Sequence, residues 1–364
     1  MRGMRALAGA VATMAAVALA GLLAGCGSGG SDGPGGSGDD GRPAIVVTTP
    51  VLAALVSELA GERAEVTALM PNGADPHEYA PSAREVARML DADLVVENGL
   101  ALEEGLSRAL EQARDAGVPV FTATDHVELR EAGAAPAPAS RPADGDAGGG
   151  HADDEHADDE HAHEERAGDV HGGDEGSPGG APGEAHAEDD HGHEGDDPHI
   201  WMDPLAMRAA MLALADELRA TLGLDVADGS AALAERLERL DARVRDILAP
   251  VPPAERRLVS GHESMGYFAD RYRFEVVGFL LPSLSSQAGV SAGNLAALRS
   301  RVEAEGVRVI LDETGTPAGV ADAIARETGA RVVRVGTHTL PEDGSYETFI
   351  TDIARTLAGA YAAG

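Results

Sequence analysis

The stretch AIVVTTPVLAALVSELAGERAEVTALM, residues 44–70, decides the fold class. It places a short apolar run, AIVVTT, before a helical pattern over about Pro50–Ala60, and a second run, AEVTAL, follows. The same alternation continues with a helix from about Ser82, DLVVEN, a helix over about Leu102–Ala116, and VPVFTA. Short strands that alternate with helices of these lengths indicate a largely parallel sheet. We therefore predict an α/β lobe that begins at Ala44.

The alternation returns after Pro253. The chain then reads RLVSG, a helix through about Tyr272, FEVVGF, a helix from about Ser291, VRVILDE, a helix from about Pro317, and RVVRVG. This second series has the build of the first. The fold class that we predict is therefore α/β, with two similar lobes whose sheets are mainly parallel.

Two helical stretches lie between the lobes, over about Pro204–Leu222 and about Gly229–Leu248. In the second stretch, apolar residues recur at helical spacing and form one face. They are Leu233, Leu237, Leu240, Val244 and Ile247. Such a face fits a helix packed on one lobe and equally a rigid connector between the two lobes.

The charge of the chain excludes some classes of function. Lys and Arg number 28 against 62 Asp and Glu, so the net charge is −34, which excludes a nucleic-acid binder with a basic face. No Lys occurs, so Lys-dependent phosphate loops and Schiff-base chemistry are excluded. Cys26 is the single Cys, which excludes an intrachain disulfide and a site of several thiolates. A bound metal ion must therefore be held by His, Asp or Glu.

The N-terminus is typical of an exported lipoprotein. Arg2 and Arg5 precede an uncharged apolar run that ends in Leu-Ala-Gly-Cys, which resembles the lipobox of bacterial lipoproteins. The alternative is a buried or incidental Cys. The following Gly/Ser-rich tract has too few apolar residues to fold. We therefore predict lipidation at Cys26, and a protein that is anchored to the outer face of the cytoplasmic membrane.

A His- and acid-rich segment interrupts the first lobe. Residues 151–198 hold 18 acidic residues against one Arg, so we expect a disordered loop. Its eight histidines are His151, His156, His161, His163, His171, His186, His191 and His193. Imidazoles interleaved with carboxylates offer weak sites for a cation such as Zn²⁺. The alternative is solvated low-complexity sequence without a role.

Three of the remaining histidines stand at the edges of the predicted lobes. His77 follows a strand in PNGADPHEYAPSAREV, His199 lies in DPHIWMDP, and His262 follows a strand in LVSGHESMGYFADRY. Open α/β sheets place ligand groups at strand ends, so three such histidines together indicate a site. His126 and His338 lie outside these three segments, and we interpret them as ordinary surface or loop residues.

These segments carry a resemblance to a known family. GADPHEYAPSAREV with ADLVVENGLALE, DPHIWMDP, GHESMGYFADRY and VILDETGTPAGVADAIARETGARVV resemble, in order, segments of the zinc- and manganese-specific substrate-binding proteins of ABC transporters. The resemblance extends from about Ala44 to the C-terminus. It includes a His- and acid-rich insertion before the second ligand segment, as in the zinc-specific members.

The resemblance implies a metal site in the cleft between two four-stranded lobes that are bridged by one long helix. His77 and His199 would come from the first lobe, and His262 and Glu313 from the second. Asp312 is an alternative acidic ligand, because the chain is one residue shorter than the family pattern at that point. Alternation along a strand places Leu311 and Glu313 on one face, which weakly favours Glu313.

Three imidazoles and one carboxylate form a near-tetrahedral site that suits Zn²⁺, whereas Mn²⁺ prefers more oxygen ligands. The expected function is high-affinity capture of Zn²⁺ outside the cell and delivery to the membrane subunits of an ABC permease. The expected protein is a monomer and is not an enzyme.

Three alternatives remain. They are a manganese-specific member of the same family, a zinc hydrolase with Glu263 or Asp312 as general base, and a surface adhesin or metal buffer in which only the loop matters. The expected organisation is a signal peptide over 1–26, a flexible tether over 27–43, a first lobe over 44–133, the His-rich loop over 134–198, the end of the first lobe with the connecting helix over 199–252, and a second lobe over 253–364.

Overall fold

The computed structural model describes residues 41–133, 195–286 and 289–362. The predicted signal peptide with Cys26, nearly all of the tether, and the eight histidines of the loop lie outside these ranges. Across the described ranges, no helix has both the length and the apolar character that crossing a membrane requires.

The first sheet is parallel and has the strand order β2-β1-β3-β4. Its strands are β1 (Ala44–Val47), β2 (Glu65–Ala68), β3 (Leu94–Glu97) and β4 (Val120–Thr122), and its helices are α1 (Pro50–Ala60), α2 (Ala83–Leu90) and α3 (Ser107–Asp115). Ile45 and Val47 belong to the apolar cluster that contains α1, whereas Val46 belongs to the cluster that contains α3. Both faces of β1 are therefore buried, which explains its unbroken apolar run.

Local chemistry sets the start of the first two helices. The hydroxyl of Thr49 accepts a hydrogen bond from the backbone N–H of Leu52, and Pro50 occupies the first turn of α1, where its missing N–H has no helical partner to lose. Ser82 and Glu85 form a reciprocal capping box at the start of α2. The first of these caps fixes the turn directly after β1.

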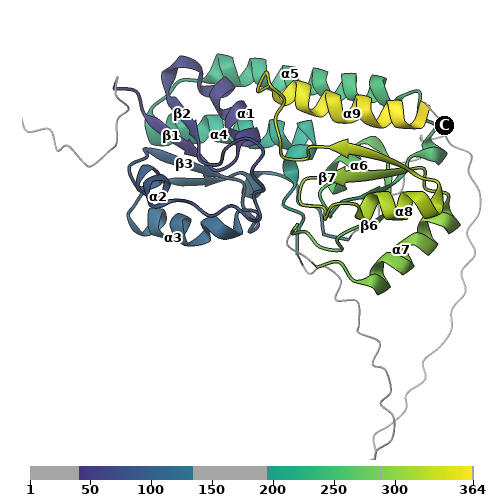
Figure 1. Cartoon of the computed structure of the whole chain (residues 1–364). Coiled ribbons are helices and arrows are strands. Elements are labelled where there is room, and N and C mark those ends of the chain that lie inside the picture. Colours follow the sequence, from purple (N-terminus) through teal and green to yellow (C-terminus); the bar gives the residue numbers. More distant parts are fainter. Residues whose placement is uncertain (1–40, 134–194, 287–288, 363–364) are drawn as a thin grey trace, which may run out of the picture. The chain divides into compact units, whose positions relative to one another are not determined.

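The second sheet is also parallel, in the order β6-β5-β7-β8. Its strands are β5 (Arg257–Ser260), β6 (Glu275–Phe279), β7 (Val309–Glu313) and β8 (Arg331–Val335), and its helices are α6 (Gly266–Tyr272), α7 (Ala292–Glu305) and α8 (Val320–Thr328). Figure 1 shows each sheet with its own helices. The prediction of two parallel α/β lobes is confirmed.

Three longer helices complete the fold, namely α4 (Pro204–Leu222), α5 (Ala227–Leu248) and α9 (Tyr346–Ala362). The predicted apolar face of α5 is buried, and α5 packs against α1 and α4 as well as α9, as Figure 1 shows. It therefore contacts helices that follow strands of both sheets. The sequence reasoning did not anticipate α9. Short 3-10 turns lie at Gly61–Arg63, Glu104–Leu106, Ala123–His126, Ile200–Met202 and Pro253–Glu255.

The carboxyl ends of the strands lead into the segments that carry the candidate ligands. His77 lies after β2, His262 lies two residues after β5, and Glu313 is the last residue of β7. The segment after β8 carries His338. In open α/β sheets these loops are where ligand groups gather.

Candidate metal centre

Three of the predicted ligands meet in space. His77, His199 and His262 each offer one ring nitrogen, and these nitrogens all lie within 4.8 Å of one another. The ring centroids are 5.5 Å apart for His77 and His199, 5.6 Å for His77 and His262, and 5.1 Å for His199 and His262. The three residues are only 3%, 0% and 1% exposed. The fold therefore concentrates three imidazoles at one buried point.

A tight turn holds His77. The backbone N–H of His77 donates to the carboxylate of Asp75 at 3.0 Å, and the N–H of Tyr79 donates to the Asp75 carbonyl at 3.0 Å. Burial, followed by the nearby rings of His199 and His262, lowers the pKa of His77 to about 2. The ring is therefore neutral at ordinary pH, which is the form that binds a metal ion.

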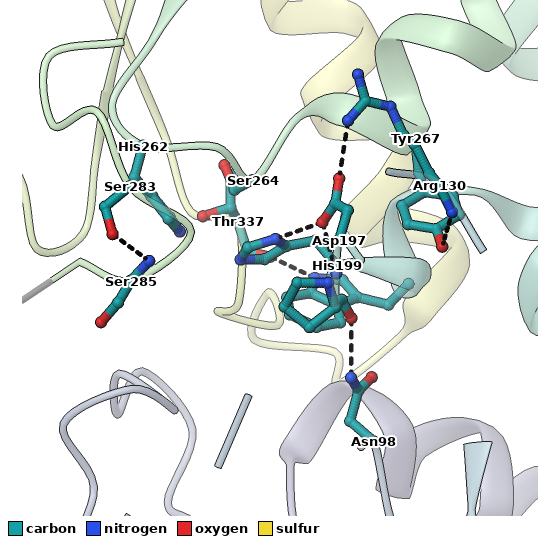
Figure 2. Close-up of polar contacts among 12 residues, drawn as sticks. Asn98, Arg130, Asp197, His199, His262, Ser264, Tyr267, Ser283, Ser285 and Thr337 are labelled. Carbon is teal, nitrogen blue, oxygen red and sulfur yellow. Dashed lines mark hydrogen bonds and ion pairs between the residues drawn. The ribbon is translucent and has the colours of Figure 1, made fainter. Parts of the chain in front are cut away.

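A carboxylate from its own segment orients His199. Oδ1 of Asp197 lies 2.8 Å from Nδ1 of His199 and also accepts the His199 backbone N–H at 2.9 Å. Oδ2 of Asp197 lies 3.4 Å from Nη1 of Arg130, and Figure 2 shows Asp197 between these two residues. When Nδ1–H donates to Asp197, Nε2 is left with a lone pair for an ion. Burial lowers the pKa of His199 despite the opposing effect of Asp197.

A carboxylate from a neighbouring strand orients His262. Oε2 of Glu313 lies 3.0 Å from Nδ1 of His262. Burial disfavours the charged ring, yet the hydrogen bond and charge of Glu313 raise the pKa of His262. This pair is a second arrangement of carboxylate and imidazole in which Nε2 faces the site.

The carboxylate of Glu313 is fully engaged behind His262. Its oxygens accept hydrogen bonds from the hydroxyl of Ser260, the backbone N–H of Gly261 and the hydroxyl of Ser264. Burial alone would raise the pKa of Glu313, but bonds from His262, Ser260 and Ser264 hold that pKa at about 2. The carboxylate is therefore ionised and firmly held.

Glu313 does not belong to the group of ligand atoms that the structure brings together. The resemblance implies that Glu313 binds the ion directly, and this stays a prediction; in the structure Oε2 of Glu313 lies 3.0 Å from Nδ1 of His262. The alternative acid, Asp312, points to the other face of β7, where Arg334 Nε lies 3.1 Å from its Oδ2. The difference arises because β5 and β7 are paired neighbours, so Glu313 at the end of β7 meets the segment that follows β5.

His338 is a fourth buried imidazole, and its interpretation as an ordinary surface or loop residue is wrong. It is 4% exposed, and its ring centroid lies 6.0 Å from that of His262. Its Nδ1 lies 3.3 Å from the hydroxyl of Thr337. Within the described part of the chain, Nε2 of His199, His262 and His338 is buried and makes no hydrogen bond. Burial, followed by the charge of His262, lowers the pKa of His338 to about 4.

A sequence signal for His338 existed. It stands three residues after the strand RVVRV, much as His262 stands two residues after the end of β5. His126, the other histidine set aside, is exposed and stacks on Phe121 at a centroid distance of 4.6 Å. The two histidines that the sequence treated alike therefore have opposite environments.

Asn98 supports the site from the loop after β3. Its side-chain amide donates to the carbonyl of Pro198, directly before His199, at 2.8 Å. Figure 2 shows the amide of Asn98 directed toward His199. Its own backbone N–H donates to the buried carboxylate of Glu103 at 2.8 Å, which also accepts from the hydroxyl of Thr48 at 2.6 Å. The motif ADLVVENGLALE thus contributes contacts that support His199, and the sequence did not predict them.

Glu263, a general base in the hydrolase alternative, is buried beside the site. Burial and the nearby charge of Asp197 raise the pKa of Glu263 to about 7. Its backbone N–H donates to the carbonyl of Ser283 at 3.0 Å. It follows His262 directly, yet it does not belong to the group of atoms that could hold an ion among the described residues.

The chain is similar to several known metal-binding proteins. The profile of the family described as zinc-uptake complex component A, periplasmic, matches residues 45–360. The manganese-binding lipoprotein MntA of Halalkalibacterium halodurans is 24% identical over 90% of this chain and 90% of its own length. The high-affinity zinc uptake system protein ZnuA of Paracoccus denitrificans is 31% identical over 87% of this chain and 91% of its own length.

A solved structure shows the same fold. The periplasmic zinc-binding protein TroA from Treponema pallidum matches with a TM-score of 0.63 at 21% identity, over 88% of this chain and 99% of that one. The resemblance seen in the sequence motifs is thereby confirmed. The chain belongs to the family of zinc-uptake complex component A periplasmic proteins, the metal-binding substrate-binding proteins of ABC transporters.

Proposed function

We propose that this protein captures Zn²⁺ outside the cell with high affinity and delivers it to the membrane subunits of an ABC permease. The observation that carries the proposal is the convergence of three buried imidazoles, with a fourth alongside, in a group that contains no carboxylate oxygen. Nitrogen donors suit Zn²⁺, whereas Mn²⁺ favours sites richer in oxygen. The donor set therefore supports zinc over manganese.

Each residue has a defined role in this proposal. Nε2 of His77, His199 and His262 would bind the ion, and His338 would complete a tetrahedron of nitrogens. Asp197 and Glu313 would hold two of the rings in the tautomer that leaves Nε2 available. Glu313 thus enters as the residue that orients His262, in place of the direct ligand that the sequence suggested.

Manganese is the second candidate cargo, because the relative MntA is named a manganese-binding lipoprotein. A half-buried carboxylate, that of Asp75, lies in the His77 turn, where its Oδ2 accepts from the Ser286 hydroxyl at 2.6 Å. A rearrangement that brought this carboxylate to the ion would add the oxygen that Mn²⁺ prefers. Competition between the two ions measures the preference directly.

The remaining parts of the proposal rest on sequence. The chain would be exported, lipidated at Cys26 and tethered as a monomer at the outer face of the cytoplasmic membrane, close to its permease. The His-rich loop would raise the local concentration of cations over the 8–10 Å or so across which charge acts at ordinary ionic strength. Deleting residues 151–193 should slow zinc uptake when zinc is scarce and leave the tight site intact. Unchanged uptake under those conditions would contradict a role for the loop.

The test is zinc titration of the full-length protein in detergent, in competition with a chelator of known affinity. We expect one tight Zn²⁺ per chain, lost when His77, His199 and His262 are all changed to Ala, while weaker loop sites persist. Manganese should compete poorly. Tight binding that survives the triple change would place the function in the loop and favour the metal-buffer alternative.

A further inference from the structure

The segment that carries His338 is held on both sides by side chains from outside the second lobe. This segment follows β8 and leads to α9. Directly before His338, the carbonyl of Thr337 accepts a hydrogen bond from the indole N–H of Trp201 at 2.6 Å. Two residues after His338, Leu340 contacts the side chain of Asn72, which lies in the loop after β2. His338 lies between these two attachments.

Asn72 pairs with Leu340 as a strand would pair with its neighbour. The amide Nδ2 of Asn72 donates to the Leu340 carbonyl at 2.8 Å, and Oδ1 of Asn72 accepts the Leu340 N–H at 2.8 Å. The two bonds use one donor and one acceptor of each partner, so only an amide in this orientation satisfies both. They join residues that are 268 positions apart in the chain.

We propose that Asn72 is a positioning residue. Its two hydrogen bonds to Leu340, which we call the clasp, join the two lobes over the metal centre, hold His338 in place and slow the release of the ion. The inference rests on the proposed function, since it assumes that the four histidines enclose a metal ion. Asn72 lies five residues before His77, and Leu340 lies two residues after His338. The clasp therefore ties the loop of one ligand to the loop of another.

Among the described residues, the ring of His338 has one hydrogen-bonding partner. A small cavity of about 10 Å³, large enough for one water molecule, borders its ring and is lined also by Met70 and Trp201. Its Nδ1 has only the adjacent Thr337 hydroxyl, in contrast to the carboxylates behind His199 and His262. The placement of His338 consequently depends on the backbone attachments at Thr337 and Leu340, together with the Thr337 hydroxyl, which donates to Oε2 of Glu313 at 3.4 Å.

Release of the ion requires these attachments to separate. The four histidines are at most 4% exposed, so an ion held among them cannot leave while the loops stay together. Trp201 keeps one attachment of the segment when Asn72 is changed. Loss of the clasp should therefore speed dissociation without destroying the site.

The experiment compares the full-length protein with Asn72→Ala and Asn72→Asp. Zinc dissociation is followed by stopped flow after mixing with excess chelator, and the visible spectrum of the Co²⁺-loaded protein reports the coordination geometry. The loss of two neutral hydrogen bonds should speed dissociation of Zn²⁺ about ten- to thirtyfold in Asn72→Ala. Asn72→Asp keeps the acceptor for the Leu340 N–H but sets a carboxylate oxygen against the Leu340 carbonyl, so its dissociation rate should be at least as fast as that of Asn72→Ala.

Tyr361→Phe is the matched control. It removes a side-chain bond to a backbone carbonyl, that of Arg257 at 2.6 Å, between α9 and β5 and away from the clasp. If Asn72 were only structural, Asn72→Ala and Tyr361→Phe would lower the melting temperature of the metal-free protein alike and leave the dissociation rate and Co²⁺ spectrum unchanged. That result would overturn the inference. Absence of tight zinc binding in the unaltered protein would instead overturn the proposed function.

Discussion

His199 and His262 each contact a carboxylate through Nδ1, but the two carboxylates come from different parts of the chain. Asp197, the partner of His199, lies two residues earlier in the same segment, whereas Glu313, the partner of His262, lies 51 residues later at the end of another strand. The first arrangement is local and depends on the conformation of one short segment. The second exists only because β5 and β7 are neighbours in the sheet. The same carboxylate–imidazole contact therefore depends on local structure in one lobe and on tertiary structure in the other.

The largest expected effect on zinc affinity comes from removing the side chain of either His199 or His262. His199→Ala and His262→Ala should each weaken zinc binding by more than about 100-fold, the upper range for losses caused by residues behind a ligand. Competition titration with a chelator measures the change. A loss of less than tenfold in either variant would exclude that histidine from the site.

Glu313→Gln should weaken zinc binding by about 100-fold, because the new amide group must face donors from His262, Ser260 or Ser264. The thermal stability of the metal-free protein should fall as well, since either orientation of the amide sets its NH2 group against an N–H that cannot accept, that of Gly261 or Nδ1–H of His262. Asp312→Asn is the matched control on the same strand, where the side chain faces Arg334, and it should leave zinc affinity unchanged. A larger effect for Asp312→Asn than for Glu313→Gln would favour Asp312, the alternative acid, as the ligand.

His338→Ala should weaken zinc binding roughly ten- to hundredfold, because water would replace the fourth nitrogen. His126→Ala, which removes an exposed ring, should have no effect on affinity. Isothermal titration of the two variants side by side tests whether burial distinguishes the two histidines that the sequence treated alike. Equal affinities would show that three imidazoles suffice.

Asp197→Asn should have the smallest effect of the four, about tenfold in zinc affinity. The Asn side-chain oxygen can still accept the backbone N–H of His199 and its Nδ1–H, but the charge that faces Arg130 is lost. Comparing the zinc affinities of Asp197→Asn and Glu313→Gln tests whether the His199–Asp197 pair, which is local in sequence, tolerates substitution better than the His262–Glu313 pair. An effect as large as that of Glu313→Gln would remove the proposed difference.

Much of the fold could be predicted because the pattern of the chain is local. The run Ala44–Val47 is apolar throughout, since both of its faces are covered, and Thr49 with Pro50 marks where α1 begins. The helix expected from about Pro317 begins instead at Val320, because Gly319 takes a left-handed conformation with φ of 81°. The helix expected from about Leu102 begins with a 3-10 turn at Glu104. Such boundaries depend on a few backbone angles that periodicity does not reveal.

The role of α5 illustrates what periodicity leaves open. Its leucines predict a buried face, but the face itself does not say what covers it. The structure supplies α4, α1 and α9 as partners, and α9 was itself missed. A connecting helix and a helix packed on one lobe have the same sequence pattern, so only the positions of its neighbours separate them.

By itself, the sequence determined the two α/β lobes and pointed to His77, His199 and His262, because strand ends and their adjacent loops are local features. The tertiary structure alone decided which groups stand behind those histidines. It brought Glu313 to His262, buried His338 beside them, and paired Asn72 with Leu340. The physical reason is that a metal centre is made from side chains distant in sequence, and their separations are set by strand order and lobe packing.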